Sequence, residues 1–142
     1  MTIAENLQVA RENSKQPRSD EEVMKLIVEV GLAERLHEEA GSLSGGQLRL
    51  LEIVRCLAAG SNAILLDEPT AGVSPKMRGE LQAIIRRAQA TGVTMFIIEH
   101  DMNFIFELCS RVLVMHEGKL ILQGTPQELR ANPQLAEIYF GK

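Results

Sequence analysis

The chain has 142 residues, of which 45% are hydrophobic, 24% are charged and 4% are aromatic, and its formal net charge is -4. This composition is that of a folded globular domain, or of part of one, and it argues against intrinsic disorder. A mildly acidic chain without tryptophan is a poor nucleic-acid binder, because phosphate contacts and base stacking would both be weak. No apolar run approaches the roughly 18 residues that a membrane-spanning helix needs.

The first part of the chain has the pattern of consecutive amphipathic helices. Thr2-Ile3-Ala4-Glu5 and Ser19-Asp20-Glu21-Glu22 are capping boxes, in which a hydroxyl residue is followed three positions later by a glutamate. They predict helices over residues 2–11 and 20–30. A third helix is expected over residues 47–59, where apolar residues recur at helical spacing.

The middle of the chain alternates strands and a helix. Residues 63–66 and 93–98 are short continuous apolar runs, which are typical of strands covered on both faces. Between them, Ser74-Pro75 predicts the start of a helix that ends at Gly92. A strand–helix–strand order implies parallel pairing, so the expected fold class is α/β.

The last part of the chain is predicted to form a hairpin followed by short helices. Strands are expected over residues 111–115 and 119–124, with His116-Glu117-Gly118 as the turn between them. Thr125-Pro126-Gln127-Glu128 is another capping box, and Asn132-Pro133 predicts the start of a last helix.

The first candidate site is Leu43-Ser44-Gly45-Gly46-Gln47, at the mouth of the third expected helix. Two adjacent glycines let a ligand approach the backbone closely, and a helix N-terminus offers free N–H donors with a partial positive charge. Ser44 adds a hydroxyl donor. The combination predicts an anion site suited to a phosphate, and the alternative is an ordinary glycine-rich turn before a helix.

Three polar side chains follow the two apolar runs, where ligands of parallel sheets bind. Asp67 is predicted to hold Mg²⁺ through water, and Glu68 to accept a proton from an attacking water. The alternative is an acidic turn that Pro69 ends. His100 is predicted to hydrogen-bond a phosphate oxygen or to position water. Its alternative is a surface histidine beside Asp101, the cap of the next helix.

The order of these sites resembles that of the ATP-binding cassette (ABC) ATPases. Leu43–Gln47 matches the signature motif of that family residue for residue. The run 63–67 with Glu68 is similar to the Walker B strand and its catalytic glutamate. The segment Ala71, Gly72, Val73, Ser74 occupies the place of the D-loop, and His100 that of the switch histidine.

The resemblance also implies which part of a cassette the chain represents. Its 142 residues contain no G-x-x-x-x-G-K-[ST] P-loop, because Gly118-Lys119 lies in the expected hairpin and Gly141-Lys142 ends the sequence. The chain is therefore expected to be the C-terminal part of an ABC nucleotide-binding domain of the P-loop NTPase type. Residues 1–59 would be the helical subdomain with the signature motif, and residues 60–142 the C-terminal half of the nucleotide-binding core.

ATP hydrolysis coupled to transport, with ATP and Mg²⁺ as cofactors, is the activity that the resemblance implies. Ser44, Gly45, Gly46 and Gln47 would contact the nucleotide of a second cassette. Without a P-loop, the chain alone is expected to bind ATP weakly and to hydrolyse it negligibly. The implied partners are a second ABC ATPase subunit and transmembrane permease subunits, with no nucleic acid. The implied location is cytoplasmic, peripheral on the inner face of the cell membrane.

Some segments are similar to those of the ATPases that power branched-chain amino acid uptake. These include Ile98-Glu99-His100-Asp101-Met102, the D-loop segment and Gly124-Thr125-Pro126. Lipopolysaccharide-export and urea-uptake ATPases have similar segments, so an ATPase of either kind is an alternative. An alternative of another class is a non-catalytic remnant, or a half-cassette that only binds a partner.

Overall fold

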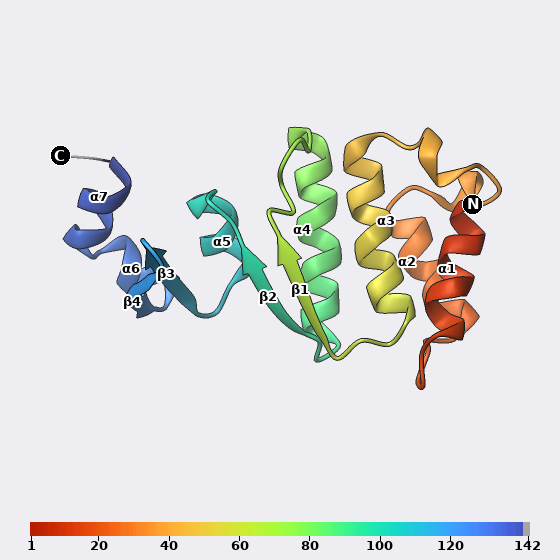
Figure 1. Cartoon of the computed structure of the whole chain (residues 1–142), viewed down its shortest axis with the longest axis horizontal. Coiled ribbons are helices and arrows are strands. Elements are labelled where there is room, and N and C mark those ends of the chain that lie inside the picture. Colours follow the sequence, from red (N-terminus) through yellow and green to blue (C-terminus); the bar gives the residue numbers. More distant parts are fainter. Residues whose placement is uncertain (141–142) are drawn as a thin grey trace. The chain divides into compact units, whose positions relative to one another are not determined.

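The computed structural model describes residues 1–140, and the chain divides into two compact units, Met1–Ile98 and Glu99–Lys142. Figure 1 shows the elements of both units in chain order. The sequence predicts a different division, after residue 59, between the helical subdomain and the nucleotide-binding core of a cassette. That functional division stays a prediction. Within residues 1–140 we find no helix with the length and hydropathy of a membrane span.

The first unit, all of which is described, consists of four α-helices, two strands and two short 3-10 helices. The α-helices are α1 (Ile3–Glu12), α2 (Asp20–Glu29), α3 (Gly45–Ala58) and α4 (Pro75–Ala90). The strands are β1 (Ala63–Asp67) and β2 (Thr94–Ile98), and the 3-10 helices are η1 (Ala33–Arg35) and η2 (Ala40–Ser42). Helix α3 contacts α1, α2 and α4, so it is the central helix of this unit.

Helices α1 and α2 begin where the capping boxes predict. The hydroxyls of Thr2 and Ser19 accept hydrogen bonds from the backbone N–H groups of Glu5 and Glu22. Each glutamate carboxylate in turn accepts a bond from the backbone N–H of its capping residue. The predicted start points of both helices are therefore confirmed.

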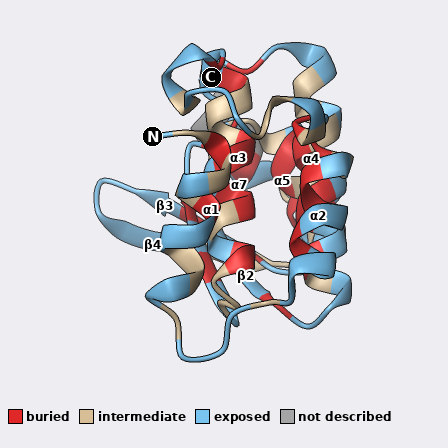
Figure 2. Cartoon of the chain, turned by 90° about the vertical axis from the view of Figure 1, so that its right-hand side faces the viewer, coloured by how far each residue is buried: buried red, intermediate tan, exposed pale blue. Residues whose placement is uncertain are grey.

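The core of the first unit lies where the apolar faces of its helices meet. Figure 2 shows buried residues along the inner faces of α1, α2, α3 and α4. The largest fully buried aliphatic side chains of this unit are those of Ile3, Ile27, Leu32, Leu50, Ile53, Leu57, Leu81, Ile84 and Ile85. All four α-helices contribute to this list, so the core depends on packing between helices.

Strands β1 and β2 pair in parallel along their whole length, as expected, and α4 connects them. The apolar runs predict strands that can be covered on both faces, and the described chain covers one face of them. Ile64 and Leu66 are buried, but Leu65 is 69% exposed and its register partner Phe96 is 59% exposed. Successive side chains of a strand point to opposite faces, and the helices of the first unit cover only one face.

The second unit contains the predicted hairpin and helices. Its described elements are α5 (Met102–Leu108), β3 (Val112–His116), β4 (Lys119–Gly124), α6 (Pro126–Arg130) and α7 (Pro133–Phe140). Strands β3 and β4 are antiparallel, and positive φ angles of 47° at Glu117 and 76° at Gly118 make the turn between them. The predicted turn is therefore confirmed.

The carbonyl end of α3 is held by the loop that follows α1. The Arg18 side chain donates from Nε to the Leu57 carbonyl oxygen at 3.1 Å. The backbone N–H of Arg18 donates to the Ala58 carbonyl at 3.0 Å, and the Ser14 hydroxyl donates to the Ala59 carbonyl. The last carbonyls of a helix have no partner within the helix, so these bonds satisfy them and anchor α3 to the loop.

Gly60 allows this loop to lie directly against the end of α3. Its φ is 73°, and a Cβ placed on it would lie 1.9 Å from the carbonyl oxygen of Gln16. Gly31 has a similar φ of 68°, but a Cβ there would meet no heavy atom of the described residues within 4 Å. The two glycines therefore share a left-handed backbone and differ in the space around them.

We expect Gly31→Ala to lower the free energy of unfolding by about 1–2 kcal/mol, the cost of left-handed backbone for a residue with a Cβ. Gly60→Ala should lower it by more, because the new methyl group also displaces the Gln16 backbone and the loop. Urea unfolding followed by circular dichroism measures both changes. Equal losses in the two variants would contradict the role of the close contact at Gly60.

Candidate functional site

The signature residues form the first turn of α3. Ser44 is the N-cap, and its hydroxyl accepts a hydrogen bond from the backbone N–H of Gln47 at 3.3 Å. The Gln47 Oε1 atom accepts a bond from the backbone N–H of Ser44 at 3.1 Å, which completes a capping box. Ser44 and Gly45 are exposed. The first N–H groups of a helix carry a partial positive charge, so this turn favours an anion in front of it.

The capping box of α3 differs in charge from those of α1, α2 and α6. In those three helices the third helical residue is a glutamate, namely Glu5, Glu22 and Glu128, whereas α3 has Gln47. The backbone N–H of Ser19, and then its hydroxyl, hold the pKa of Glu22 below its ordinary value. A carboxylate there offsets the positive end of its own helix. The first turn of α3 has no acidic residue, so its positive end stays available to an outside anion.

The two signature glycines have different surroundings. A Cβ on Gly46 would lie 2.6 Å from Sδ of Met77, so Gly46 lets the first turn of α4 pack closely on α3. A Cβ on Gly45 would meet no heavy atom of the described residues within 4 Å. A side chain at Gly46 would therefore have to displace the thioether of Met77, whereas one at Gly45 would displace nothing that the structure describes. The open space at Gly45 gives a ligand direct access to the backbone.

Two exposed carboxylates lie where β1 ends. Asp67 is the last residue of β1, and Glu68 follows it with a positive φ of 42°. The backbone N–H of Glu68 donates to the Ile98 carbonyl oxygen at 2.9 Å, which fixes this turn to the end of β2. Left-handed backbone at a residue other than glycine is costly, and such residues cluster at functional sites.

The residues at the end of β1 fit a magnesium ion that arrives together with phosphate. Within residues 1–140 no three His, Cys, Asp or Glu side chains are grouped so that they could hold a metal ion by themselves. Mg²⁺ is usually held by one or two carboxylates, with water and phosphate oxygens as its other ligands. Asp67 supplies one exposed carboxylate, beside a hollow of about 180 Å³ that Leu66 and Pro69 also line.

The segment Ala71–Ser74 connects these carboxylates to α4. Gly72 has a φ of 69°, and Ser74 is the N-cap of α4, with its hydroxyl accepting a bond from the Met77 N–H at 3.4 Å. Met77 is also the residue that contacts Gly46. Figure 1 shows the first turns of α3 and α4 at the same end of the first unit as the arrowheads of β1 and β2. The signature turn, the carboxylates and the D-loop segment therefore share one end of this unit.

His100 lies in the second unit, just before α5. Its side chain is 76% exposed, and its Nδ1 atom lies 3.8 Å from Oε2 of Glu99, whose side chain is fully buried. Asp101 caps α5 by accepting bonds from the N–H groups of Asn103 and Phe104. The sequence indicates a helix cap as the alternative role of Asp101, and the structure confirms this role. The role of His100 stays a prediction.

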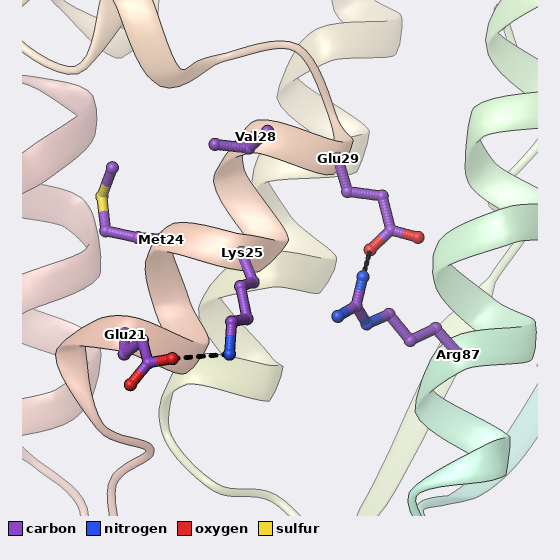
Figure 3. Close-up of a pocket in the computed structure, with 6 residues that line it drawn as sticks. All are labelled: Glu21, Met24, Lys25, Val28, Glu29 and Arg87. Atoms are coloured by element: carbon purple, nitrogen blue, oxygen red, sulfur yellow. Dashed lines mark hydrogen bonds and ion pairs between the residues drawn. The ribbon is translucent and has the colours of Figure 1, made fainter.

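A larger hollow lies between α2 and α4 and involves none of the predicted site residues. Its volume is about 380 Å³, and it is lined by Glu21, Met24, Lys25, Val28, Glu29 and Arg87 (Figure 3). The charged residues of its wall pair with one another, Lys25 with Glu21 and Arg87 with Glu29. Paired charges of both signs do not select an anion, so this hollow is not the phosphate site.

Two residues near the signature turn were not predicted from the sequence. Met77 fills the space above Gly46, and the guanidinium of Arg35 donates from Nη1 to Oε1 of Gln47 at 3.1 Å. Arg35 lies 12 positions before Gln47 and is the last residue of the 3-10 helix η1, between α2 and α3. No periodic pattern links such positions, so only the folded arrangement reveals these contacts.

Comparison with known proteins places the chain in a family. Residues 1–71 match the ABC transporter family. Over its whole length the chain is 35% identical to the high-affinity branched-chain amino acid transport ATP-binding protein BraF of Pseudomonas aeruginosa, of which it covers 63%. It is 37% identical to the lipopolysaccharide export system ATP-binding protein LptB of Acidithiobacillus ferridurans, over 82% of this chain and 48% of that protein.

Solved structures agree with this result. The ADP conformation of MJ1267, an ATP-binding cassette of an ABC transporter, superimposes on the whole chain with a TM-score of 0.80 and 29% identity. The chain covers 63% of that structure. The protein therefore belongs to the ABC transporter family, and its expected α/β cassette fold is confirmed. A third relative is the high-affinity branched-chain amino acid transport ATP-binding protein LivG of Salmonella typhimurium, 36% identical over 80% of this chain. The chain spans between 45% and 63% of the length of these three curated relatives.

Proposed function

We propose that this chain is the part of an ABC transporter ATPase that combines the signature motif with the carboxylates of the hydrolytic site. The observation that carries the proposal is the first turn of α3. There the exposed Ser44 and Gly45, together with the neutral Gln47, leave a positive helix end open to solvent. A phosphate group is the ligand that such a turn binds best.

In the proposed site, Ser44, Gly45, Gly46 and Gln47 contact the phosphates of an ATP molecule that a second cassette holds. The donors are backbone N–H groups and the hydroxyl and amide side chains, which form strong bonds to phosphate oxygens. The 142 residues contain no P-loop motif, so the remaining phosphate contacts in this arrangement come from that second cassette. The chain then acts as one side of a shared nucleotide site.

The carboxylates serve the nucleotide of the cassette to which they belong. Glu68 accepts a proton from the attacking water, and its strained turn at the end of β1 holds the carboxylate at the mouth of the site. Asp67 would hold Mg²⁺ through water, and the ion would supply positive charge beside the phosphates. His100 donates a hydrogen bond to the terminal phosphate.

We further propose that the transported solute is a branched-chain amino acid. The names of the BraF and LivG relatives support this choice. The LptB relative, at a similar identity, supports lipopolysaccharide export as the second candidate. Either function requires a second ATPase subunit and transmembrane permease subunits, and it places the chain on the cytoplasmic face of the membrane.

The shared site is tested by association with an intact ABC cassette that carries its own P-loop. We expect the fluorescently labelled chain to bind that cassette only when ATP is present, and Gly45→Ala to weaken this binding at least about tenfold, because the methyl group blocks access to the backbone. Gly79→Ala is the matched control, since Gly79 of α4 is also free of close neighbours among the described residues. Binding is followed by fluorescence anisotropy.

Neither alanine should lower the free energy of unfolding, because alanine favours a helix over glycine. Equal binding by the two variants would contradict the proposal. Association that does not depend on ATP would instead favour a half-cassette that only binds a partner.

The carboxylate roles are tested in a complete cassette, in which these 142 residues are joined to an N-terminal segment that contains a P-loop. We expect Glu68→Gln to lower ATP turnover by about 10²–10⁴-fold, because the amide has the shape of the carboxylate but cannot accept the proton. ATP binding, measured by equilibrium dialysis, should be unchanged. Loss of binding together with turnover would give Glu68 a structural or metal-binding role instead.

A further inference from the structure

We propose that Arg35 is a positioning residue of the signature motif, which fixes the side-chain amide of Gln47 so that its N–H₂ group is the part that meets the nucleotide. This inference rests on the proposed function and adds a residue outside the motif to it. It follows from the hydrogen bonds that meet on one atom, Oε1 of Gln47.

Arg35 uses all three nitrogens of its guanidinium in a fixed arrangement. Nε and Nη2 donate to Oε2 of Glu38 at 2.9 and 2.7 Å, and Nη1 donates to Oε1 of Gln47 at 3.1 Å. Because the guanidinium is planar and rigid, the ion pair with Glu38 also determines the direction of Nη1. Only 28% of the Arg35 side chain is exposed, so it lies largely against the protein.

Glu38 is held in turn by its neighbours. The Ser42 hydroxyl lies 3.4 Å from the same carboxylate oxygen and donates to the Glu39 carbonyl at 2.8 Å. The guanidinium of Arg35 holds the pKa of Glu38 below its ordinary value, so the carboxylate keeps its charge to a lower pH than a free glutamate does. The ion pair with Glu38 therefore holds the guanidinium of Arg35 in place for its contact with the signature turn.

Gln47 needs such an anchor because the two ends of its amide are different. In the boxes of α1, α2 and α6 the third residue is a glutamate, whose two oxygens are equivalent. A glutamine can turn either its oxygen or its N–H₂ group toward the backbone N–H of Ser44, and only the oxygen completes the box. The Arg35 guanidinium can only donate hydrogen bonds. It therefore also favours the orientation in which the Gln47 oxygen faces the backbone N–H of Ser44, and it disfavours the reversed one.

The orientation has a direct consequence for ligand binding. With two donors on Oε1, the N–H₂ group of Gln47 is left as a pair of donors at the anion-binding end of α3. A nucleotide oxygen can accept from these donors without disturbing the cap. If Arg35 is lost, only the bond from the Ser44 N–H still selects the oxygen, so a larger share of the molecules presents an acceptor to the nucleotide.

Arg35→Lys tests the proposal because it keeps the charge but removes the planar fork. The matched control is Arg49→Lys, since Arg49 forms a comparable ion pair with Glu52 three residues later but has no described bond to Gln47. The first measurement is NMR on the whole chain, with the side-chain amide signal of Gln47 assigned by its loss in Gln47→Ala. We expect the heteronuclear NOE of this amide to drop in Arg35→Lys and to stay unchanged in Arg49→Lys.

The second measurement is the ATP-dependent association with an intact cassette. We expect Arg35→Lys to raise the dissociation constant about twofold, because an amide that turns freely presents its donors in about half of the molecules, and Arg49→Lys to leave it unchanged. In a Gln47→Ala background, Arg35→Lys should have no further effect. If Arg35 acted on stability alone, the losses of binding affinity from the two substitutions would add in the double variant.

These outcomes distinguish a failure of the Arg35 proposal from a failure of the proposed shared nucleotide site. A Gln47 amide that is equally ordered in Arg35→Lys and in the unaltered chain would overturn the positioning role. An unchanged dissociation constant, with Gly45→Ala still losing binding, would also overturn it and leave the shared site intact. Association without ATP dependence would refute the shared site, and the NMR result would still decide whether Arg35 orients Gln47.

Discussion

Hydrogen bonds at the carbonyl end of α3 determine where its opposite end, the signature turn, is held. Arg18 and Ser14 bind the last carbonyls of this helix, and Gly60 lets their loop lie directly on it. Helix α3 contacts the three other α-helices of the first unit, so a shift of α3 would disturb the packing of all of them. The carbonyl groups at one end of α3 thus have hydrogen-bond donors within the protein, whereas the first turn at the other end is open to a ligand.

The open end is connected to the other parts of the site by short physical contacts. Gly46 allows Met77 to pack on the signature turn, and Met77 belongs to the helix that the D-loop residue Ser74 caps. The carboxylates of Asp67 and Glu68 precede the same D-loop. Met77 therefore joins the signature turn directly to the first turn of α4.

Local rules explain what could be predicted from the sequence. A capping box involves residues three positions apart, so the starts of α1 and α2 were predictable, as was the left-handed turn at Glu117 and Gly118. The signature residues were recognisable because they are contiguous. The helix was expected to begin at Gln47, whereas α3 begins at Gly45, because Ser44 and Gln47 form a capping box that was not identified from the sequence.

Contacts between distant segments explain what could not be predicted. The apolar run around Leu65 indicated a strand but not which of its faces the chain would cover, because that depends on where the helices pack. Arg35 of η1 and Met77 of α4 reach the signature turn from separate elements, so no spacing rule points to them. None of these contacts indicates which solute is transported.

The central claim is that α3 keeps a positive end for a phosphate because its capping box lacks a carboxylate. The most direct test is the dissociation constant of ATP-dependent association for Gln47→Glu, with Glu22→Gln in the box of α2 as the control. The new carboxylate still completes the cap, so the free energy of unfolding should not fall, but binding should weaken about tenfold through repulsion of the phosphates. Glu22→Gln should bind as the unaltered chain does. Undiminished binding by a folded Gln47→Glu variant would contradict the account.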